Sequence, residues 1–154
     1  MEESTERRFS IWWGCLVGLT CALTVGGIAF AVLAEPLRVL FESLLYVPLT
    51  GERLRGTAAG YVALHQAVMG AVIAGWSVAL LSLLFGPFRR RERWAWVAIA
   101  ASLAVWFVLD TTYSALSHYT LNALLNAVTL ALFALPLAGT YSYFRVPTSR
   151  SQAC

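Results

Sequence analysis

The sequence contains little charge. Only 12% of its 154 residues are charged, whereas 59% are hydrophobic and the mean hydropathy is +0.69. A typical soluble domain carries about twice that share of charged residues, ~25%. This chain therefore cannot cover a water-facing surface, which excludes a soluble enzyme or binding domain and predicts an integral membrane protein.

Lysine is absent, and cysteine and histidine are scarce. All 11 basic residues are arginines near the ends of apolar runs, so the net charge of +3 is typical of membrane topology and not of a nucleic-acid partner. Cys15, Cys21 and Cys154 do not form a disulfide framework, because the first two lie in one apolar run. One histidine and one aspartate at matching depth give too few ligands for a metal site, and no glycine-rich phosphate loop follows a strand. We expect neither a metal nor a cofactor.

Long apolar runs predict four transmembrane helices, at about 11–34, 58–86, 94–116 and 121–144. At about 1.5 Å per residue, each can cross ~30 Å of hydrocarbon. The predicted fold is an all-α integral membrane protein, a four-transmembrane-helix bundle forming one domain over residues 1–146. Residues 147–154 are expected to be a disordered tail.

The segment between the first two spans has a different pattern. Leucines and a phenylalanine recur at helical spacing between Leu37 and Leu45, which predicts a short amphipathic helix over 36–46 lying on the outer surface. Pro48 and Gly51 are expected to end it. Such a helix could be a lid over whatever the spans enclose, or a connector anchored at the lipid headgroups.

Arginine counting predicts the orientation. One side of the membrane would hold both termini and most arginines: Arg7, Arg8, Arg89, Arg90, Arg91, Arg93, Arg145 and Arg150. The other would hold Arg38, Arg53 and Arg55. Because cytoplasmic loops are enriched in basic residues, we expect a multi-pass protein of the cell inner (plasma) membrane with both termini cytoplasmic.

Small residues at four-residue spacing mark faces where helices can approach closely. They are Gly14 and Gly18, then Ala67, Ala71 and Gly75, then Ala134 and Ala138. The pattern fits internal contacts of the bundle, and it fits a homodimer face or a partner membrane subunit equally well.

Polar side chains inside the predicted spans gather in the outer half of the membrane. They are Asp110, His65, Gln66, Asn122 and Asn126, from three helices, and Trp106 and Tyr113 share the helical face of Asp110. Intramembrane polar groups are costly and need partners. The seven residues could line a binding pocket, or the polar ones could only join the helices through hydrogen bonds.

The chain also resembles known membrane proteins. The stretches Pro87–Trp96 and Trp106–Thr111, followed by Asn122 and Asn126, are similar to uncharacterised small bacterial four-span membrane proteins over about residues 60–140. This resemblance implies four spans and no assigned reaction. A looser similarity is to the four-span family of sterol isomerases and sigma-2-type receptors, which place acidic residues in a lipid-facing cavity. This chain has one firmly intramembrane acid, Asp110.

Three functions follow as hypotheses. The first is binding of a membrane lipid or small amphiphile in the polar pocket. The second is a structural or accessory subunit of a membrane complex, whose polar cluster only sets helix contacts. The third is a membrane-embedded isomerase-like enzyme with His65 and Asp110 as its acid and base.

Overall fold

The protein is an all-α bundle of four long helices. The computed structural model describes residues 2–144, except the side chains of Glu2 and Ser4. The helices are α1 (Glu2–Val32), α4 (Gly56–Leu83), α5 (Arg93–Leu116) and α6 (Thr120–Thr140). A π-helical turn, η2 (Leu84–Phe88), extends α4, and a 3₁₀ turn, η3 (Tyr141–Phe144), extends α6. The expected tail, 147–154, lies outside the described residues.

All four helices are long and apolar enough to cross a membrane, over Thr5–Val32, Gly56–Phe88, Arg93–Leu116 and Thr120–Phe144. This confirms the expected four-span fold, and the chain is a multi-pass membrane protein. The start of the first helix differs from the expectation, because α1 continues through the charged residues before Ile11.

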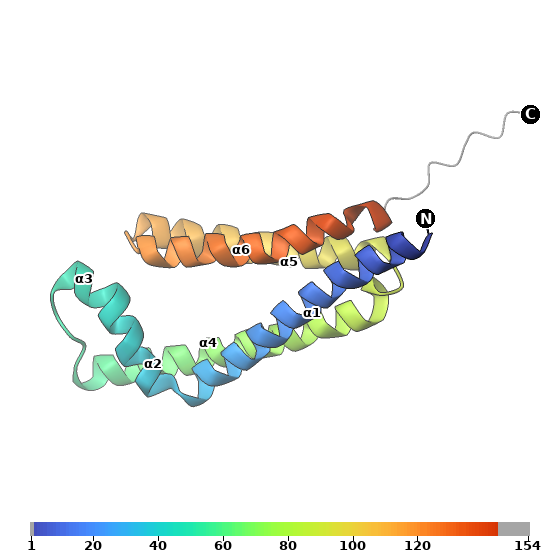
Figure 1. Ribbon diagram of the computed structural model, residues 1–154. Coiled ribbons are helices and arrows are strands. Elements are labelled where there is room, and N and C mark those ends of the chain that lie inside the picture. The colour runs from blue at the N-terminus through green and yellow to red at the C-terminus, as the bar shows by residue number, and fades with distance from the viewer. Residues whose placement is uncertain (1, 145–154) are drawn as a thin grey trace, which may run out of the picture.

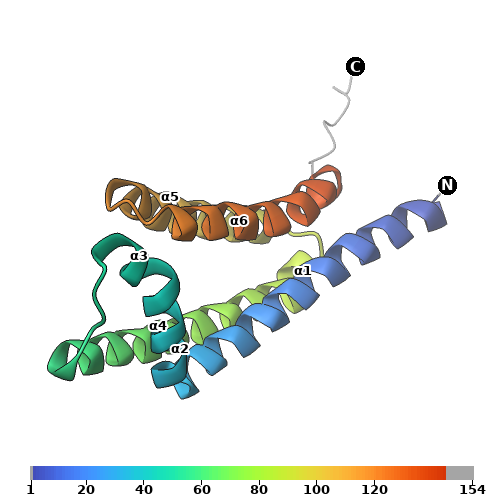
Figure 2. The same cartoon turned by 60° about the vertical axis from the view of Figure 1, so that its left-hand side comes forward.

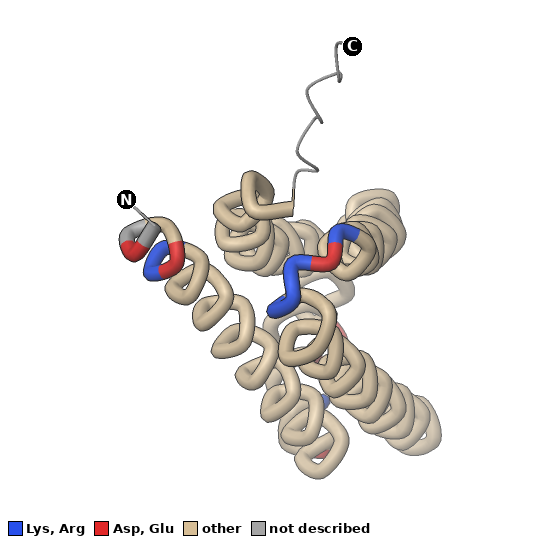
Figure 3. The backbone as a smooth tube through the Cα atoms, turned by 90° about the vertical axis from the view of Figure 1, so that its right-hand side faces the viewer, with Lys and Arg blue, Asp and Glu red and all other residues tan. Residues whose placement is uncertain are grey.

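The helices form two antiparallel pairs. α1 packs along α4, and α5 packs along α6, while α6 also contacts α1. The pairs meet at the end that carries the loop 89–92, and they diverge toward the end that carries α3 (Figures 1 and 2). We call these the arginine-loop end and the α3 end. Figure 3, viewed from the arginine-loop end, shows the charged loop between α4 and α5 beside the charged start of α1.

Two prolines set the ends of the first two spans. A proline ring clashes with the carbonyl group four residues earlier and provides no N–H to bond it. Four residues before Pro36 is Val32, where α1 ends, and four before Pro87 is Leu83, where α4 ends. Pro136 is different, because α6 continues through it to Thr140.

The connecting segment, residues 33–55, contains the expected short helix. α2 (Ala34–Phe41) leads through a π-helical turn, η1 (Glu42–Tyr46), into α3 (Val47–Thr50). The expectation that Pro48 ends this helix is wrong: proline is tolerated in a first helical turn, and Pro48 occupies that place in α3. Gly51 ends the helix instead, with a φ of 72° that glycine adopts without strain.

The connecting segment is held by one buried carboxylate. Glu42 is 6% exposed and accepts a bond from the Arg38 guanidinium at 2.5 Å. Its other oxygen accepts the backbone N–H of Leu54 at 2.7 Å. Arg38 also donates to Glu35, and the pKa of Arg38 is raised first by that bond and further by Glu42. These bonds join α2 to the chain entering α4.

The apolar core lies toward the arginine-loop end. Its buried members come from all four long helices and their extensions: Phe9, Leu16, Leu80, Leu84, Phe88, Ala95, Ile99, Leu103, Phe133, Leu137 and Phe144. At its tip the ring of Phe88 lies 4.7 Å from that of Phe144 and 6.3 Å from that of Phe9, centroid to centroid. These aromatic contacts tie α4 to α6 and α1.

Close approach of α1 and α4 occurs at Gly27 and Gly70. A Cβ atom added at Gly70 would lie 2.6 Å from the Gly27 carbonyl oxygen, so only glycine fits. The small residues singled out from spacing lie elsewhere: Gly14, Gly18 and Gly75 are exposed and have open space where a Cβ would stand. Ala134 and Ala138 are exposed as well.

Candidate functional site

A membrane-embedded cleft lies between the two helix pairs, toward the α3 end. Its volume is about 800 Å³. Most of its lining is apolar, and the lining residues are Leu23, Phe30, Phe41, Met69, Val72, Ile73, Trp76, Ala101, Ser102, Val105, Trp106, Asp110, Asn122, Asn126 and Thr129. We call it the interhairpin cleft. It exists because the pairs meet at one end and diverge at the other (Figure 2).

Asp110 is the one acidic group in the lining of this cleft, and it forms a polar triad with Ser114 and Asn122. Asn122 Nδ2 on α6 donates to Asp110 Oδ1 at 3.1 Å, and Ser114 Oγ donates to the same oxygen at 3.2 Å. Asn122 also donates to Ser114 Oγ at 2.7 Å. The triad fixes the carboxylate at the wall and joins α5 to α6.

Asn126 lies one helical turn from Asn122 and has a different environment. It is 6% exposed and lines the cleft. Its Nδ2 atom has no hydrogen-bond partner among residues 2–144. Leaving a buried polar group unpaired costs about 1–3 kcal/mol, so this amide has free capacity to donate to a molecule in the cleft.

Aromatic side chains form much of the apolar lining. The rings of Trp76 on α4 and Trp106 on α5 lie 6.4 Å apart, centroid to centroid, in a tilted arrangement. Phe41 of α2 contacts Phe30 of α1 edge-on at 5.2 Å. Because Phe41 is part of the lining, the connecting segment contributes to the cleft itself.

The structure thus brings four of the predicted site residues together: Trp106, Asp110, Asn122 and Asn126. The other three do not line the cleft. His65 is exposed on α4 with its ring 4.5 Å from that of Tyr61, and Tyr113 is 69% exposed. Gln66 is partly buried, and its Oε1 has no partner among the described residues.

Helix geometry explains Tyr113. At about 100° per residue, the side chain three residues after Asp110 is rotated from it by about 60° around the helix axis. The side chain four residues after Asp110 is rotated by about 40° in the other direction. The second of these is Ser114, which is buried against Asp110, whereas Tyr113 turns outward. Ser114 was missed in the sequence, although its four-residue spacing from Asp110 was the available signal.

The arrangement does not bring an acid and a base together. No hydrogen bond joins His65 to Asp110 in the described part of the chain, and His65 is not in the lining. No group of three or more histidine, cysteine or acidic side chains that could hold a metal occurs within residues 2–144. What the cleft offers is an acceptor at Asp110, a donor at Asn126 and apolar walls.

These features define a class, a multi-pass four-helix membrane protein with a cleft between two helical hairpins. Comparisons with protein-family models, curated proteins and solved structures found no match for the chain. The resemblances drawn from the sequence motifs therefore stay predictions.

Proposed function

We propose that the protein binds a small amphiphile or a single membrane lipid in the interhairpin cleft. The observation that carries this proposal is the buried, unpartnered Nδ2 of Asn126, in a lining that also contains Asp110 and is otherwise mainly apolar. The polar head would bond to Asp110 and Asn126. The apolar part would lie along the side chains of α4 and α5 that face the cleft.

Size and chemistry support a small ligand. A volume of about 800 Å³ lies within the usual ~300–1,000 Å³ of small-molecule pockets. An acceptor at Asp110 and a donor at Asn126 favour a head group that both donates and accepts, such as a hydroxyl or an amide. Accessible apolar walls favour an attached hydrocarbon part.

A purely structural role accounts for less of the site. The bonds among Asp110, Ser114 and Asn122 are what an accessory subunit would need to join its helices. Asn126 adds nothing to that network, yet it is buried. A leucine of similar size would serve helix contacts better, because it leaves no amide unpaired.

The test uses Asn126→Leu in purified protein, with Thr140→Val as the matched control on the same helix. Thr140 is buried but bonds to Leu137 of its own helix, away from the cleft. Thermal unfolding is followed with and without fractionated membrane-lipid extracts, and native mass spectrometry identifies what is retained. A ligand at one hundred times its Kd stabilises the folded state by about 2.7 kcal/mol.

We expect Asn126→Leu to be as stable as wild type, or more stable, without added lipid, and to lose the stabilisation that a lipid fraction gives. Asp110→Asn should reduce that stabilisation too, while Thr140→Val should keep it. Loss of stability without any change in the response to lipid would contradict binding and favour the accessory-subunit hypothesis.

We further propose the plasma membrane as the location, with both termini cytoplasmic. The support is the gathering of arginines at one end of the bundle. Single cysteines at Arg90 and Glu52, in a variant lacking Cys15, Cys21 and Cys154, test it with an impermeant thiol reagent. Arg90→Cys should react only after permeabilisation and Glu52→Cys in intact cells; the reverse pattern would overturn the orientation.

A further inference from the structure

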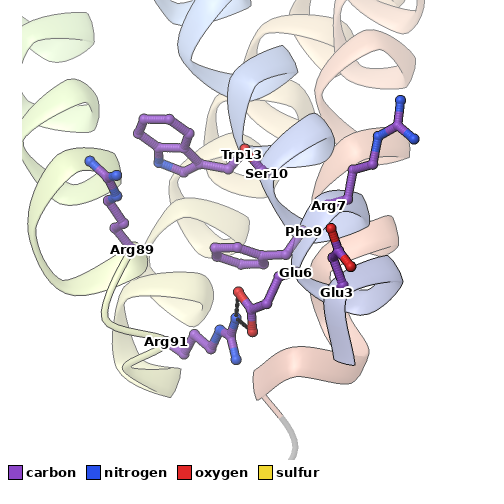
Figure 4. A pocket seen from close by; sticks show the side chains of 8 residues that line it. All are labelled: Glu3, Glu6, Arg7, Phe9, Ser10, Trp13, Arg89 and Arg91. Atoms are coloured by element: carbon purple, nitrogen blue, oxygen red, sulfur yellow. Dashed lines mark hydrogen bonds and ion pairs between the residues drawn. The ribbon is translucent and has the colours of Figure 1, made fainter. Parts of the chain in front are cut away.

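A second cleft lies at the arginine-loop end, between the first turns of α1 and the loop 89–92. Its volume is about 540 Å³. The side chains that matter are Glu6, Phe9 and Trp13 of α1 and Arg89 and Arg91 of the loop (Figure 4). We call it the arginine cleft. It shares no lining residue with the interhairpin cleft.

The arginines of the loop differ in how their charge is compensated. Arg90 donates to Glu92 at 2.6 Å, and this bond, followed by one from Trp94, holds the pKa of Glu92 below its ordinary value. Arg91 donates to both oxygens of Glu6, using Nη2 alone. Among the side chains that the structure describes, which exclude that of Glu2, no carboxylate pairs with Arg89. Within the cleft, which Arg7 also lines, the loop therefore supplies an uncompensated guanidinium at Arg89 and one with free N–H groups at Arg91.

Aromatic rings hold these two guanidinium groups in place. Arg89 lies over the ring of Trp13 at 4.9 Å, and Trp13 is itself fixed by donating from Nε1 to the Leu84 carbonyl at 2.9 Å. Arg91 lies over the ring of Phe9 at 4.8 Å. A guanidinium stacked on a ring keeps its N–H edge free, and that planar edge matches the oxygens of a phosphate.

The position of this cleft is that of a lipid headgroup. It lies where α1 passes from its charged start, with Glu6, to the apolar run that begins at Ile11. Ile11 and Trp12 next to it are exposed, 54% and 37%. Exposed tryptophans at such a boundary lie at headgroup level. Two acids also line the cleft, but Glu6 is paired with Arg91, and Glu3 lies away from Arg89 (Figure 4).

We infer that the arginine cleft binds the phosphate of a lipid headgroup with net negative charge, through Arg89 and the free N–H groups of Arg91. Glu6 then positions Arg91 and is not a ligand. Zwitterionic headgroups are disfavoured, because their cationic group would lie among arginines. The inference does not depend on what the interhairpin cleft binds.

Arg89→Gln tests this site, with Arg90→Gln as its matched control. Both changes remove one positive charge from the same loop, but Arg90 does not line the cleft and is paired with Glu92. Lipid retention by purified protein is measured by native mass spectrometry in mixed micelles of phosphatidylglycerol or phosphatidylcholine. A third arm adds soluble glycerol phosphate, which carries the same phosphate without acyl chains.

We expect wild type and Arg90→Gln to retain phosphatidylglycerol in preference to phosphatidylcholine. Arg89→Gln should bind phosphatidylglycerol roughly tenfold more weakly or worse, since a bond between charged groups is lost, while its thermal stability without lipid stays close to that of wild type. Glycerol phosphate competing at equal concentration would assign the site to soluble phosphates and overturn a lipid headgroup. Equal losses in both variants would overturn the site, because they would reflect net charge alone.

Discussion

The two ends of the bundle differ in whether all of their buried polar side-chain atoms have hydrogen-bond partners among the described residues. Toward the arginine-loop end, the buried hydroxyls of Thr20, Ser77 and Thr140 each donate to a carbonyl of their own helix. The buried polar atoms without a partner among the described residues are Gln66 Oε1, Thr111 Oγ1 and Asn126 Nδ2, all in the half toward the α3 end.

Apolar contacts divide in the same way. The buried aromatic residues, Phe9, Phe88, Phe133 and Phe144, all belong to the cluster at the arginine-loop end. The aromatic rings of Phe41, Trp76 and Trp106 line the open interhairpin cleft instead, although Trp76 also packs against that cluster. Buried apolar contacts are therefore concentrated at the arginine-loop end, so substitutions at the two ends should differ in their effect on stability.

The largest effect is expected from Phe88→Ala. Phe88 is fully buried and its ring contacts Phe9 and Phe144, so truncation should destabilise the bundle by on the order of 3 kcal/mol. Phe41→Ala, at the cleft, loses one partly exposed contact with Phe30 and should cost about 1 kcal/mol. Unfolding in mixed micelles measures both. Equal costs would mean that the two ends contribute alike to stability.

A smaller effect is expected from Gly70→Ala. Its Cβ would lie 2.5 Å from the Ala31 backbone nitrogen, so α1 and α4 must separate, at a cost of about 1–3 kcal/mol. Gly75→Ala is the control on the same helix, since its Cβ would meet open space, and it should change stability by less than about 0.5 kcal/mol. A neutral Gly70→Ala would mean that this crossing tolerates a wider spacing.

The sequence predicted which segments are helices better than which faces meet. Run lengths and Pro36 and Pro87 mark the spans, because backbone chemistry acts locally. The rotation of each helix is harder, since lipid-facing and core-facing sides are both apolar. Spacing singled out Gly14 and Gly18 because of this, whereas Gly27 and Gly70 make the close contact.

The same limit applied to the candidate site. Depth along each span grouped Asp110 with Asn122, and the bond between them shows that depth was enough for this pair. Depth also grouped His65 with them, but His65 is turned to the outer surface of α4. The depth of a residue in the membrane follows from its position along the span. The rotation of a helix about its axis depends on which neighbouring helix it packs against.

The smallest effect is expected from Ser114→Ala, which tests the polar triad against its counterpart at the other end. Ser114 donates to Asp110 and accepts from Asn122, so its loss should cost about 0.6–1.7 kcal/mol, the range for bonds between membrane helices. Ser77→Ala removes only a bond to the carbonyl of Ile73 in its own helix. Such bonds slightly destabilise helices, so the change in stability should be close to zero.

Unfolding of both variants, alone and combined with Asn122→Ala, gives the coupling energy between each serine and Asn122 directly. Ser114 should couple to Asn122 and Ser77 should not, because only the first pair shares a hydrogen bond. If Ser77 coupled equally, the triad would not be a local joint between α5 and α6, and Asp110 would owe its position to the bundle as a whole.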